Sequence, residues 1–151
     1  MGREIERKFL VRNDDYIRMS SDRIHIMQGY LSTRKEATVR VRLWNDSGFI
    51  TVKGPNTGAV RSEWEYPVPA ADVRDMLSGL AQGGVIDKTR YIVPYDGHTW
   101  EVDVFHGRLE GLTLAEVELT DENETVDLPS FVGEEVTGDP QYYNSNLSAK
   151  A

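Results

Sequence analysis

Residues 4–11 read Glu-Ile-Glu-Arg-Lys-Phe-Leu-Val, and ionisable side chains recur there at every second position from Glu4 to Lys8. Successive side chains of a β-strand point to opposite faces of the sheet, so the ionisable residues Glu4, Glu6 and Lys8 would share one face. The residues between them would share the other face, which is mainly apolar. The stretch therefore predicts a strand with one ionic face and one face suited to packing.

The same alternation returns along the chain as pairs of like charges two residues apart. One such pair, Glu122/Glu124, falls among loop-forming residues, whereas the others have apolar flanks. These others, together with a single cation at Lys53, are Arg40/Arg42, Glu63/Glu65, Lys88/Arg90, Glu101/Asp103 and Glu116/Glu118. Because each lies among strand-forming residues, several strands are expected to carry an ionic face.

Segments with a period of two predict eight strands. They cover residues 3–12, 23–33, 37–45, 48–55, 60–68, 85–95, 98–106 and 113–120. Short turn sequences such as Asp96-Gly97 separate several of them. Turns of this length join antiparallel neighbours, because parallel strands need long crossover connections.

Between Pro69 and Gly84 the apolar period changes from two to that of a helix. The apolar residues there are spaced i, i+3, i+4 and i+7, and they are Val73, Met76, Leu77 and Leu80. This spacing predicts an amphipathic helix that ends before Gly83-Gly84.

Smaller expectations concern the remaining segments. Residues 128–136 are expected to form a short helix, residues 14–19 a helical turn, and the polar residues 138–151 an extended tail over the surface. The tryptophans are expected to pack on the outer apolar face of the sheet, and they are Trp44, Trp64 and Trp100.

The ionic strand faces allow two arrangements. In an ordinary antiparallel sheet they would face water, with the apolar faces packed in a core. However, like charges placed side by side repel each other, and eight strands are enough to close a barrel around side chains or one small ligand. The fold class is therefore expected to be mainly β (α+β), an eight-stranded antiparallel closed β-barrel with a charged lumen and a few helices packed outside.

Composition sets further bounds. A chain of 151 residues with a formal charge of −8 and no cysteine is expected to form one domain, residues 1–151, without general nucleic-acid binding. No apolar run approaches the roughly 20 residues of a membrane-spanning helix, and no hydrophobic secretion signal opens the chain. A cytoplasmic protein that does not bind membranes is expected, and a homodimer stays open.

A barrel of this kind would hold many charges of both signs in one lumen. Removing ions from water costs several kcal/mol each, so such a lumen must stay wet or be filled with partners. Carboxylates suit Mg²⁺ or Mn²⁺, whereas arginines and lysines suit phosphate oxygens. The acids are Glu4, Glu6, Glu63, Glu65, Glu101, Asp103, Glu116 and Glu118, and the bases are Lys8, Arg40, Arg42, Lys53, Lys88 and Arg90.

The chain resembles the CYTH superfamily, also called triphosphate tunnel metalloenzymes, in its short bacterial form. The resemblance begins at residues 4–11 and continues, in order, through Val39-Arg40-Val41-Arg42, Thr51-Val52-Lys53-Gly54, Glu63-Trp64-Glu65, Lys88-Thr89-Arg90-Tyr91, Trp100 to Phe105, Ala115 to Leu119, and Val136-Thr137-Gly138-Asp139 followed by Tyr143-Asn144. It implies an eight-stranded tunnel that binds a triphosphate and a divalent metal ion.

The resemblance also implies roles for particular residues. It assigns metal binding to Glu4, Glu6, Asp103, Glu116 and Glu118. It assigns phosphate binding to Lys8, Arg40, Arg42, Lys53, Lys88 and Arg90. The whole set except Asp103 would be catalytic, and the roles of the tunnel acids Glu63, Glu65 and Glu101 stay open.

The expected reaction is metal-dependent hydrolysis of a triphosphate phosphoanhydride, with inorganic tripolyphosphate as the first choice of substrate and Mg²⁺ or Mn²⁺ as the cofactor. A class IV-type adenylate cyclase and a thiamine or nucleoside triphosphatase are alternatives within the same resemblance. A non-catalytic module that binds polyphosphate or a nucleotide is an alternative of another class, because binding and catalysis share most contacts.

Overall fold

A computed structural model describes residues 2–151 of the chain. The described residues form one antiparallel sheet of nine strands. The strands are β1 (Gly2–Val11), β2 (Asp22–Arg34), β3 (Ala37–Trp44), β4 (Ser47–Lys53), β5 (Val60–Val68), β6 (Gln82–Tyr95), β7 (His98–Phe105), β8 (Thr113–Glu118) and β9 (Val132–Glu135). The eight predicted strands correspond to β1–β8, so the predicted fold class is confirmed.

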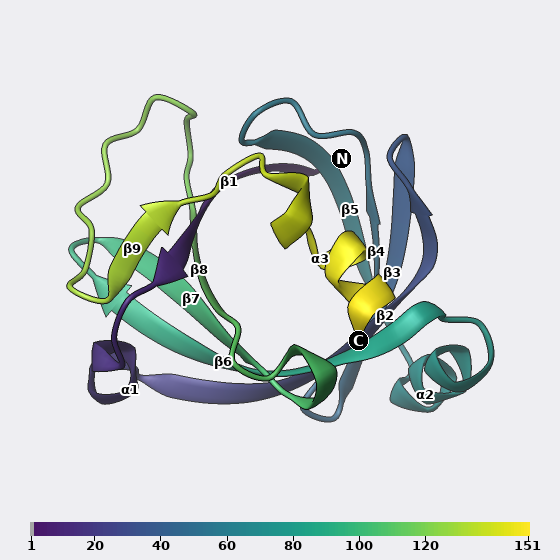
Figure 1. Ribbon diagram of the computed structural model, residues 1–151. Coiled ribbons are helices and arrows are strands. Elements are labelled where there is room, and N and C mark those ends of the chain that lie inside the picture. The colour runs from purple at the N-terminus through teal and green to yellow at the C-terminus, as the bar shows by residue number, and fades with distance from the viewer. Residues whose placement is uncertain (1) are drawn as a thin grey trace.

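The sheet closes on itself into a barrel, which Figure 1 shows nearly end-on. The strand order is β5-β4-β3-β2-β6-β7-β8-β1, and the pairing of β1 with β5 joins the two ends. Only residues 2–5 of β1 pair with β5, whereas Phe9 and Val11 pair with β9 on the same edge. The edge of β1 therefore changes partner at a short seam, Glu6–Lys8. There the Glu6 N–H donates to the carbonyl oxygen of Ala59, just before β5, and the carbonyl oxygen of Lys8 accepts from the Val136 N–H, just after β9.

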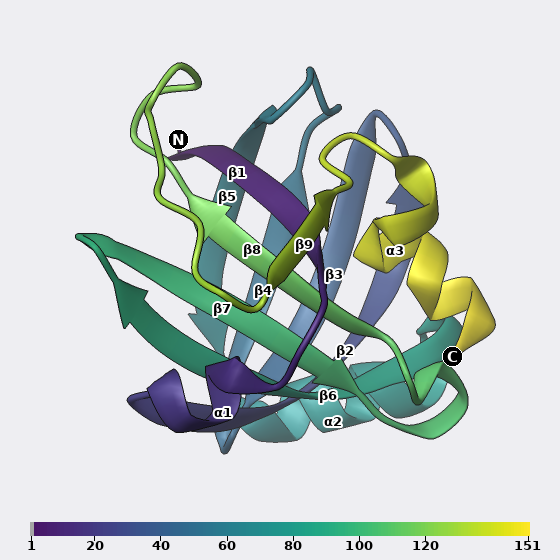
Figure 2. The same cartoon turned by 60° about the vertical axis from the view of Figure 1, so that its left-hand side comes forward.

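The helices are few and short, and they lie outside the strand ring or across one end of it (Figure 2). They are α1 (Asp15–Met19), α2 (Ala70–Gly79) and α3 (Asn144–Leu147), with 3₁₀ turns at Gly107–Leu109, Pro140–Tyr142 and Ser148–Lys150. Helix α2 and the turn at 14–19 are confirmed. Val73 of α2 is 0% exposed against Val41 and Leu43, but Leu80 lies just beyond the helix and is 61% exposed. No helix in residues 2–151 is long and apolar enough to span a membrane.

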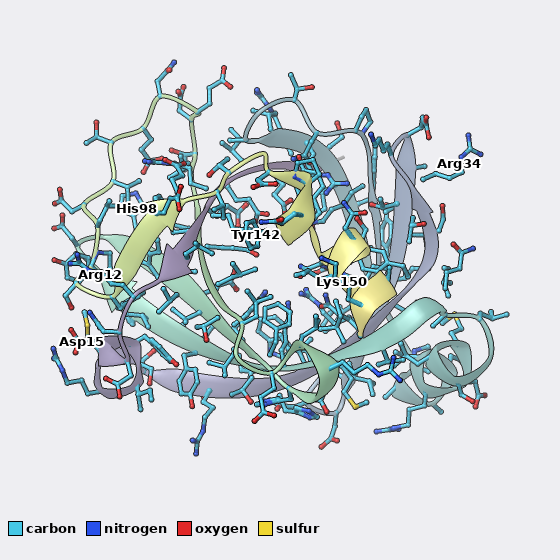
Figure 3. The ribbon with its side chains drawn as sticks, viewed as in Figure 1. Arg12, Asp15, Arg34, His98, Tyr142 and Lys150 are labelled. Atoms are coloured by element: carbon cyan, nitrogen blue, oxygen red, sulfur yellow. The ribbon has the colours of Figure 1, made fainter. Side chains whose placement is uncertain are left out.

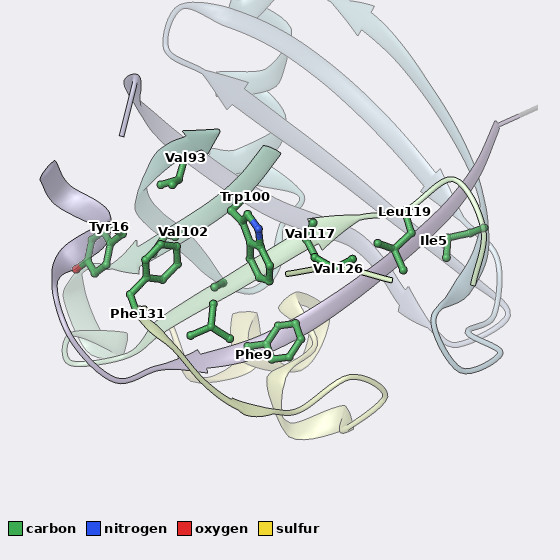
Figure 4. Packing of buried hydrophobic residues seen from close by; sticks show 12 residues of the cluster. Ile5, Phe9, Tyr16, Val93, Trp100, Val102, Val117, Leu119, Val126 and Phe131 are labelled. Carbon is green, nitrogen blue, oxygen red and sulfur yellow. The ribbon is translucent and has the colours of Figure 1, made fainter. Parts of the chain in front are cut away.

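The main apolar core lies outside the barrel, between the strands and the segments that cover them (Figure 4). Phe9, Trp100 and Phe131 pack together there, with ring centroids 5.5 Å apart for Phe9–Trp100 and 6.4 Å apart for Trp100–Phe131. Phe9 and Trp100 have the opposite strand parity to the neighbouring ionic residues. The apolar strand faces thus point outward under a cover, as predicted, and the ionic faces point inward.

The predicted helix at residues 128–136 is wrong. This segment instead enters the sheet as β9, whose residues pair with the edge of β1 beyond the seam. The free backbone groups of that edge need partners, and a strand supplies them where a helix cannot. Gly133 fits the close approach, because a Cβ there would lie 3.1 Å from the carbonyl oxygen of Leu10.

The predicted extended tail is also wrong. Residues 140–150 form short helical turns across one end of the barrel, as Figure 3 shows around Tyr142 and Lys150. Leu147 is 3% exposed and packs on apolar side chains that continue the inward faces of the strands, namely Ile86, Phe105 and Leu114. Ser148 beside it is 0% exposed, and Tyr142 and Ala151 also pack against this cluster. This end of the bore is therefore apolar and covered by the tail.

Candidate active site

Two adjoining cavities occupy the charged part of the lumen. The wide cavity has a free volume of about 390 Å³. Its lining comes from seven of the barrel strands and from the tail, and comprises Glu4, Glu6, Arg40, Arg42, Trp44, Phe49, Lys53, Glu63, Glu65, Arg90, Glu101, Glu116, Glu118 and Asn144. Every predicted tunnel acid except Asp103 is in this set.

The narrow cavity has a free volume of about 50 Å³ and lies at the seam of the barrel. Its lining adds residues of the loop before β5 and of the tail, and comprises Glu4, Glu6, Lys8, Tyr30, Thr38, Arg40, Lys53, Asn56, Gly58, Ala59, Arg61, Thr137, Gly138, Tyr143, Asn144 and Ser145. The two cavities share Glu4, Glu6, Arg40, Lys53 and Asn144. They are therefore neighbouring parts of one site.

Lys88 and Asp103 are the two predicted site residues that line neither cavity. They are 0% and 2% exposed, and Lys88 Nζ lies 2.7 Å from Asp103 Oδ2. Arg90 also donates to both oxygens of Asp103, from Nε at 2.7 Å and from a terminal nitrogen at 3.0 Å. Both oxygens of Asp103 are thus occupied by cations.

The electrostatics of this buried group follow from its pairing. Burial raises the pKa of the Asp103 carboxyl, but Arg90 and Lys88 outweigh that effect and leave the pKa below its usual range. Burial lowers the pKa of Lys88 to about 8, against the opposing attraction of Asp103. The fork of Arg90 on Asp103 fixes the direction of the guanidinium, which also contacts Glu101 at 3.1 Å and reaches the wide cavity.

The acids of β1 and β8 lie close to one another, and burial and neighbouring charges shift their pKa values. Burial, followed by repulsion from Glu116 and Glu4, raises the pKa of Glu6 well above its usual value. Burial also opposes ionisation of Glu116, but the charge of Lys8 lowers its pKa to about 2. Burial, followed by repulsion from neighbouring acids, raises the pKa of Glu118.

This set of oxygen donors fits a hard divalent cation, because such an ion would relieve the repulsion among buried carboxylates. As they stand, no three acidic or imidazole side chains within residues 2–151 converge closely enough to hold a metal ion. Glu4 is instead held by Lys53, whose Nζ lies 2.9 Å from each of its carboxylate oxygens. The chemistry of the donors fits the predicted cofactor, and Glu4, one of these donors, is paired with a lysine.

The cations of β3 are held more loosely. Terminal nitrogens of Arg40 and Arg42 lie 3.6 Å and 3.4 Å from the same oxygen of Glu65. The Thr51 hydroxyl donates to that oxygen at 2.6 Å. Burial, and then repulsion by Arg40 and Arg90, lowers the pKa of Arg42 to about 9. An anion in the wide cavity would remove this mutual repulsion.

Several residues that line the cavities were not predicted from the sequence, among them Trp44, Arg61 and Asn144. Trp44 was expected on the outer face, but it lines the wide cavity, with its ring centroid 5.1 Å from the guanidinium carbon of Arg42 and 5.6 Å from that of Arg90. Strand parity carries the signal, since Trp44 lies two residues beyond Arg42. Strand parity likewise predicts that Arg61 points inward together with Glu63. Asn144 belongs to the tail, where no strand pattern could indicate its position.

The strands thus form a closed antiparallel barrel. Its inward faces carry opposed acidic and basic groups around one solvent-accessible site. The chain belongs to the family described as the CYTH domain, whose model matches residues 2–148.

Three comparisons refine this placement. The chain is 48% identical over 147 residues to an inorganic triphosphatase of Acetivibrio thermocellus, covering 97% of this chain and 94% of that protein. It is 36% identical over 150 residues to an inorganic triphosphatase of Nitrosomonas europaea, covering 96% of each. A crystal structure of an inorganic triphosphatase superposes with a TM-score of 0.69 at 33% identity, covering 98% of this chain and 99% of that one.

Proposed function

We propose that this chain is a divalent-metal-dependent triphosphatase that hydrolyses inorganic tripolyphosphate to pyrophosphate and phosphate. The observation that carries the proposal is the convergence of both ionic sets on one site, where arginines and lysines from β1, β3, β4 and β6 face carboxylates from β1, β5, β7 and β8. The two relatives that bear the name inorganic triphosphatase support it.

The basic residues bind and orient the substrate. Guanidinium groups grip phosphate oxygens in a planar fork, so Arg40, Arg42 and Arg90 would hold the chain of phosphates across the wide cavity. Asp103 lies opposite Arg90 on the neighbouring strand and holds it in place, and Lys88 pairs with Asp103. Neither Asp103 nor Lys88 would touch the substrate. Hydrolysis needs little covalent help from protein, so fixed positive charge around the transferred group supplies most of the catalysis.

The acidic residues would hold the metal ion. Glu4, Glu6, Glu116 and Glu118 line the wide cavity and are the residues we assign to it. Bound there, Mg²⁺ or Mn²⁺ would neutralise charge on the phosphates and lower the pKa of a bound water. Glu63, Glu65 and Glu101 line the same cavity, where Glu65 and Glu101 orient arginines through ion pairs.

One contact favours an inorganic substrate over a nucleotide or thiamine triphosphate. Trp44 is the residue of the wide cavity best suited to stack on an organic ring, but its ring is already engaged by the guanidinium groups of Arg42 and Arg90. Stacking a base on the occupied surface would displace cations from the phosphates. The Trp44 ring therefore supports Arg42 and Arg90, which bind the anion, rather than an organic ring of the substrate.

The test is a substrate panel. Purified protein is assayed with Mg²⁺ and with Mn²⁺ for phosphate release from tripolyphosphate, ATP and thiamine triphosphate, and for formation of cyclic AMP from ATP. We expect tripolyphosphate to give the highest kcat/KM. Cyclic AMP as the sole product would replace this proposal with the cyclase, and tight binding without turnover of any substrate would replace it with the binding module.

A cytoplasmic location belongs to the same proposal, and localisation of a tagged protein checks it. The choice between a monomer and a homodimer stays open. Sedimentation of the purified protein over a range of concentrations decides it, since a single species with the 17.1 kDa mass of one chain at every concentration would identify the monomer.

A further inference from the structure

Arg61 is an inward-pointing cation outside the set predicted from the sequence. It lies on β5 two residues before Glu63 and pairs in register with Glu4 of β1. Because side chains two residues apart share a face, Arg61 lies on the same face as Glu63, which lines the wide cavity. Its own side chain lines the narrow cavity.

Neutral groups hold Arg61 in place. Its Nε donates to the carbonyl oxygen of Gly54 at 3.1 Å, and a terminal nitrogen donates to the Thr38 hydroxyl at 3.2 Å. None of the ion pairs among residues 2–151 includes it. The neighbouring Glu4 is bound to Lys53 instead. A positioned guanidinium without an acidic partner is well suited to an incoming anion.

The narrow cavity is small and lies against the tail. A free volume of about 50 Å³ has room for about three to five water-sized groups, at about 10–15 Å³ each, which is close to the size of one phosphoryl group. Tyr143 and Asn144 form part of its wall. Lys8, on the same wall, donates from Nζ to the carbonyl oxygen of Tyr142 at 2.9 Å, so the tail is fixed to the barrel there.

We infer that the narrow cavity is a subsite for one free terminal phosphate of the substrate, and that Arg61 is the residue that recognises it. This inference rests on the proposed function and adds an orientation to it. One unesterified end of the phosphate chain enters the narrow cavity, and the rest lies in the wide cavity. A triphosphate esterified at both ends cannot occupy the site, because the covered narrow cavity has no room for an organic group.

The first test separates a phosphate contact from a structural pin at Arg61. We expect Arg61→Ala to raise the KM for tripolyphosphate about 10- to 100-fold, the range of a lost hydrogen bond to a charged group, with a smaller effect on kcat. Arg61→Lys keeps the charge and should recover most of the affinity, whereas Arg61→Gln keeps a donor without charge and should not. Recovery by Gln and not by Lys would overturn the inference.

Arg3→Ala is the matched control. Arg3 pairs in register with Ser62, next to Arg61, but it is exposed on the opposite strand face. Arg3→Ala removes the same charge, but from the exposed outer face of the strand, so its KM should stay within about twofold of the wild-type value. An equal rise in KM for both variants would show that only the net charge of the protein matters, and this would overturn the inference.

The second test compares competitors of tripolyphosphate hydrolysis. ATP has one free terminal phosphate, whereas diadenosine triphosphate has none, so we expect ATP to inhibit at least about tenfold more strongly. Equal inhibition by the two would overturn the inference. A wild-type protein that releases no phosphate from tripolyphosphate would instead remove the proposed function, whereas an active wild type with an unchanged KM in Arg61→Ala removes only the subsite.

Discussion

Lys53 Nζ lies 2.9 Å from each carboxylate oxygen of Glu4, joining a residue assigned to phosphate binding with one assigned to metal binding. Both side chains are mostly buried, at 14% and 11% exposure. The two ionic sets therefore neutralise each other at this point. Binding of a metal ion and a triphosphate would replace this contact with one partner for each residue.

The pair should contribute measurably to stability. Removing one buried partner leaves the other uncompensated, so Lys53→Met and Glu4→Gln should each destabilise the fold, and the double variant should lose less than the sum. We expect a coupling free energy of about 1–3 kcal/mol from urea unfolding of the four proteins. Additive losses would show that the contact carries no energy.

Trp44 should position the two arginines that it contacts. Cation–π contacts contribute about 0.5–2 kcal/mol, so Trp44→Leu should raise KM for tripolyphosphate by about 2- to 30-fold. Trp44→Phe keeps an aromatic face and should recover most of that loss. Leu and Phe variants with equal KM values would show that only the apolar volume at this position matters.

Strand parity predicted most of the barrel and most of the site. Twelve of the fourteen predicted site residues line a cavity. When a strand of alternating ionic and apolar residues buries its apolar face, its ionic face must point either into the barrel or into solvent. Closure of the ring by β1 and β5 decided between these two. Roles within the site stay predictions, and they depend on ligands rather than on the fold.

The missed features depend on contacts between segments. Parity alone did not show that Asp103 pairs with Arg90, because that pairing follows from the register of the β6–β7 hairpin, in which the two residues lie opposite each other. The strand β9 forms because β1 leaves an edge open beyond the seam, and that edge is invisible in a local pattern. The tail folds inward because Leu147, with Tyr142 and Ala151, packs on apolar residues of three strands, a contact that no local pattern indicates.

The outer packing of α2 can be tested with a matched pair of residues. Val73 is 0% exposed under the helix, whereas Leu80 lies beyond its end and is 61% exposed. Val73→Ala should lower the free energy of unfolding by about 1.5–3 kcal/mol, from lost burial and the remaining cavity. Leu80→Ala should change it by less than about 0.5 kcal/mol. Equal losses in denaturant titrations would contradict the placement of the helix.

The contact between His98 and Glu124 predicts a pH-dependent stability. The hydrogen bond with Glu124 raises the pKa of His98, and hydrogen bonds from the Thr120 backbone and from His98 lower the pKa of Glu124 to about 2. The His98 contribution is thus complete below its unfolded pKa of about 6.5 and is lost as pH rises through the folded value. The Glu124 contribution is present above about pH 4.3 and is lost as pH falls towards its folded value.

Thermal melts check this dependence. His98→Gln should lower Tm at about pH 5.5 and approach the wild-type value at about pH 9, and Glu124→Gln should remove the same dependence. A deficit of equal size at both pH values would show that the contact acts through packing alone.

The most direct test of the charged barrel as a hydrolase is product analysis with tripolyphosphate, in which phosphate and pyrophosphate are measured for the wild type and for Glu116→Gln at equal concentration. We expect equal amounts of the two products from the wild type and a rate at least about 100-fold lower from the variant, the usual scale for loss of a charge-positioning group. A Glu116→Gln protein as active as the wild type, or a wild type that releases neither product with Mg²⁺ or Mn²⁺, would contradict it.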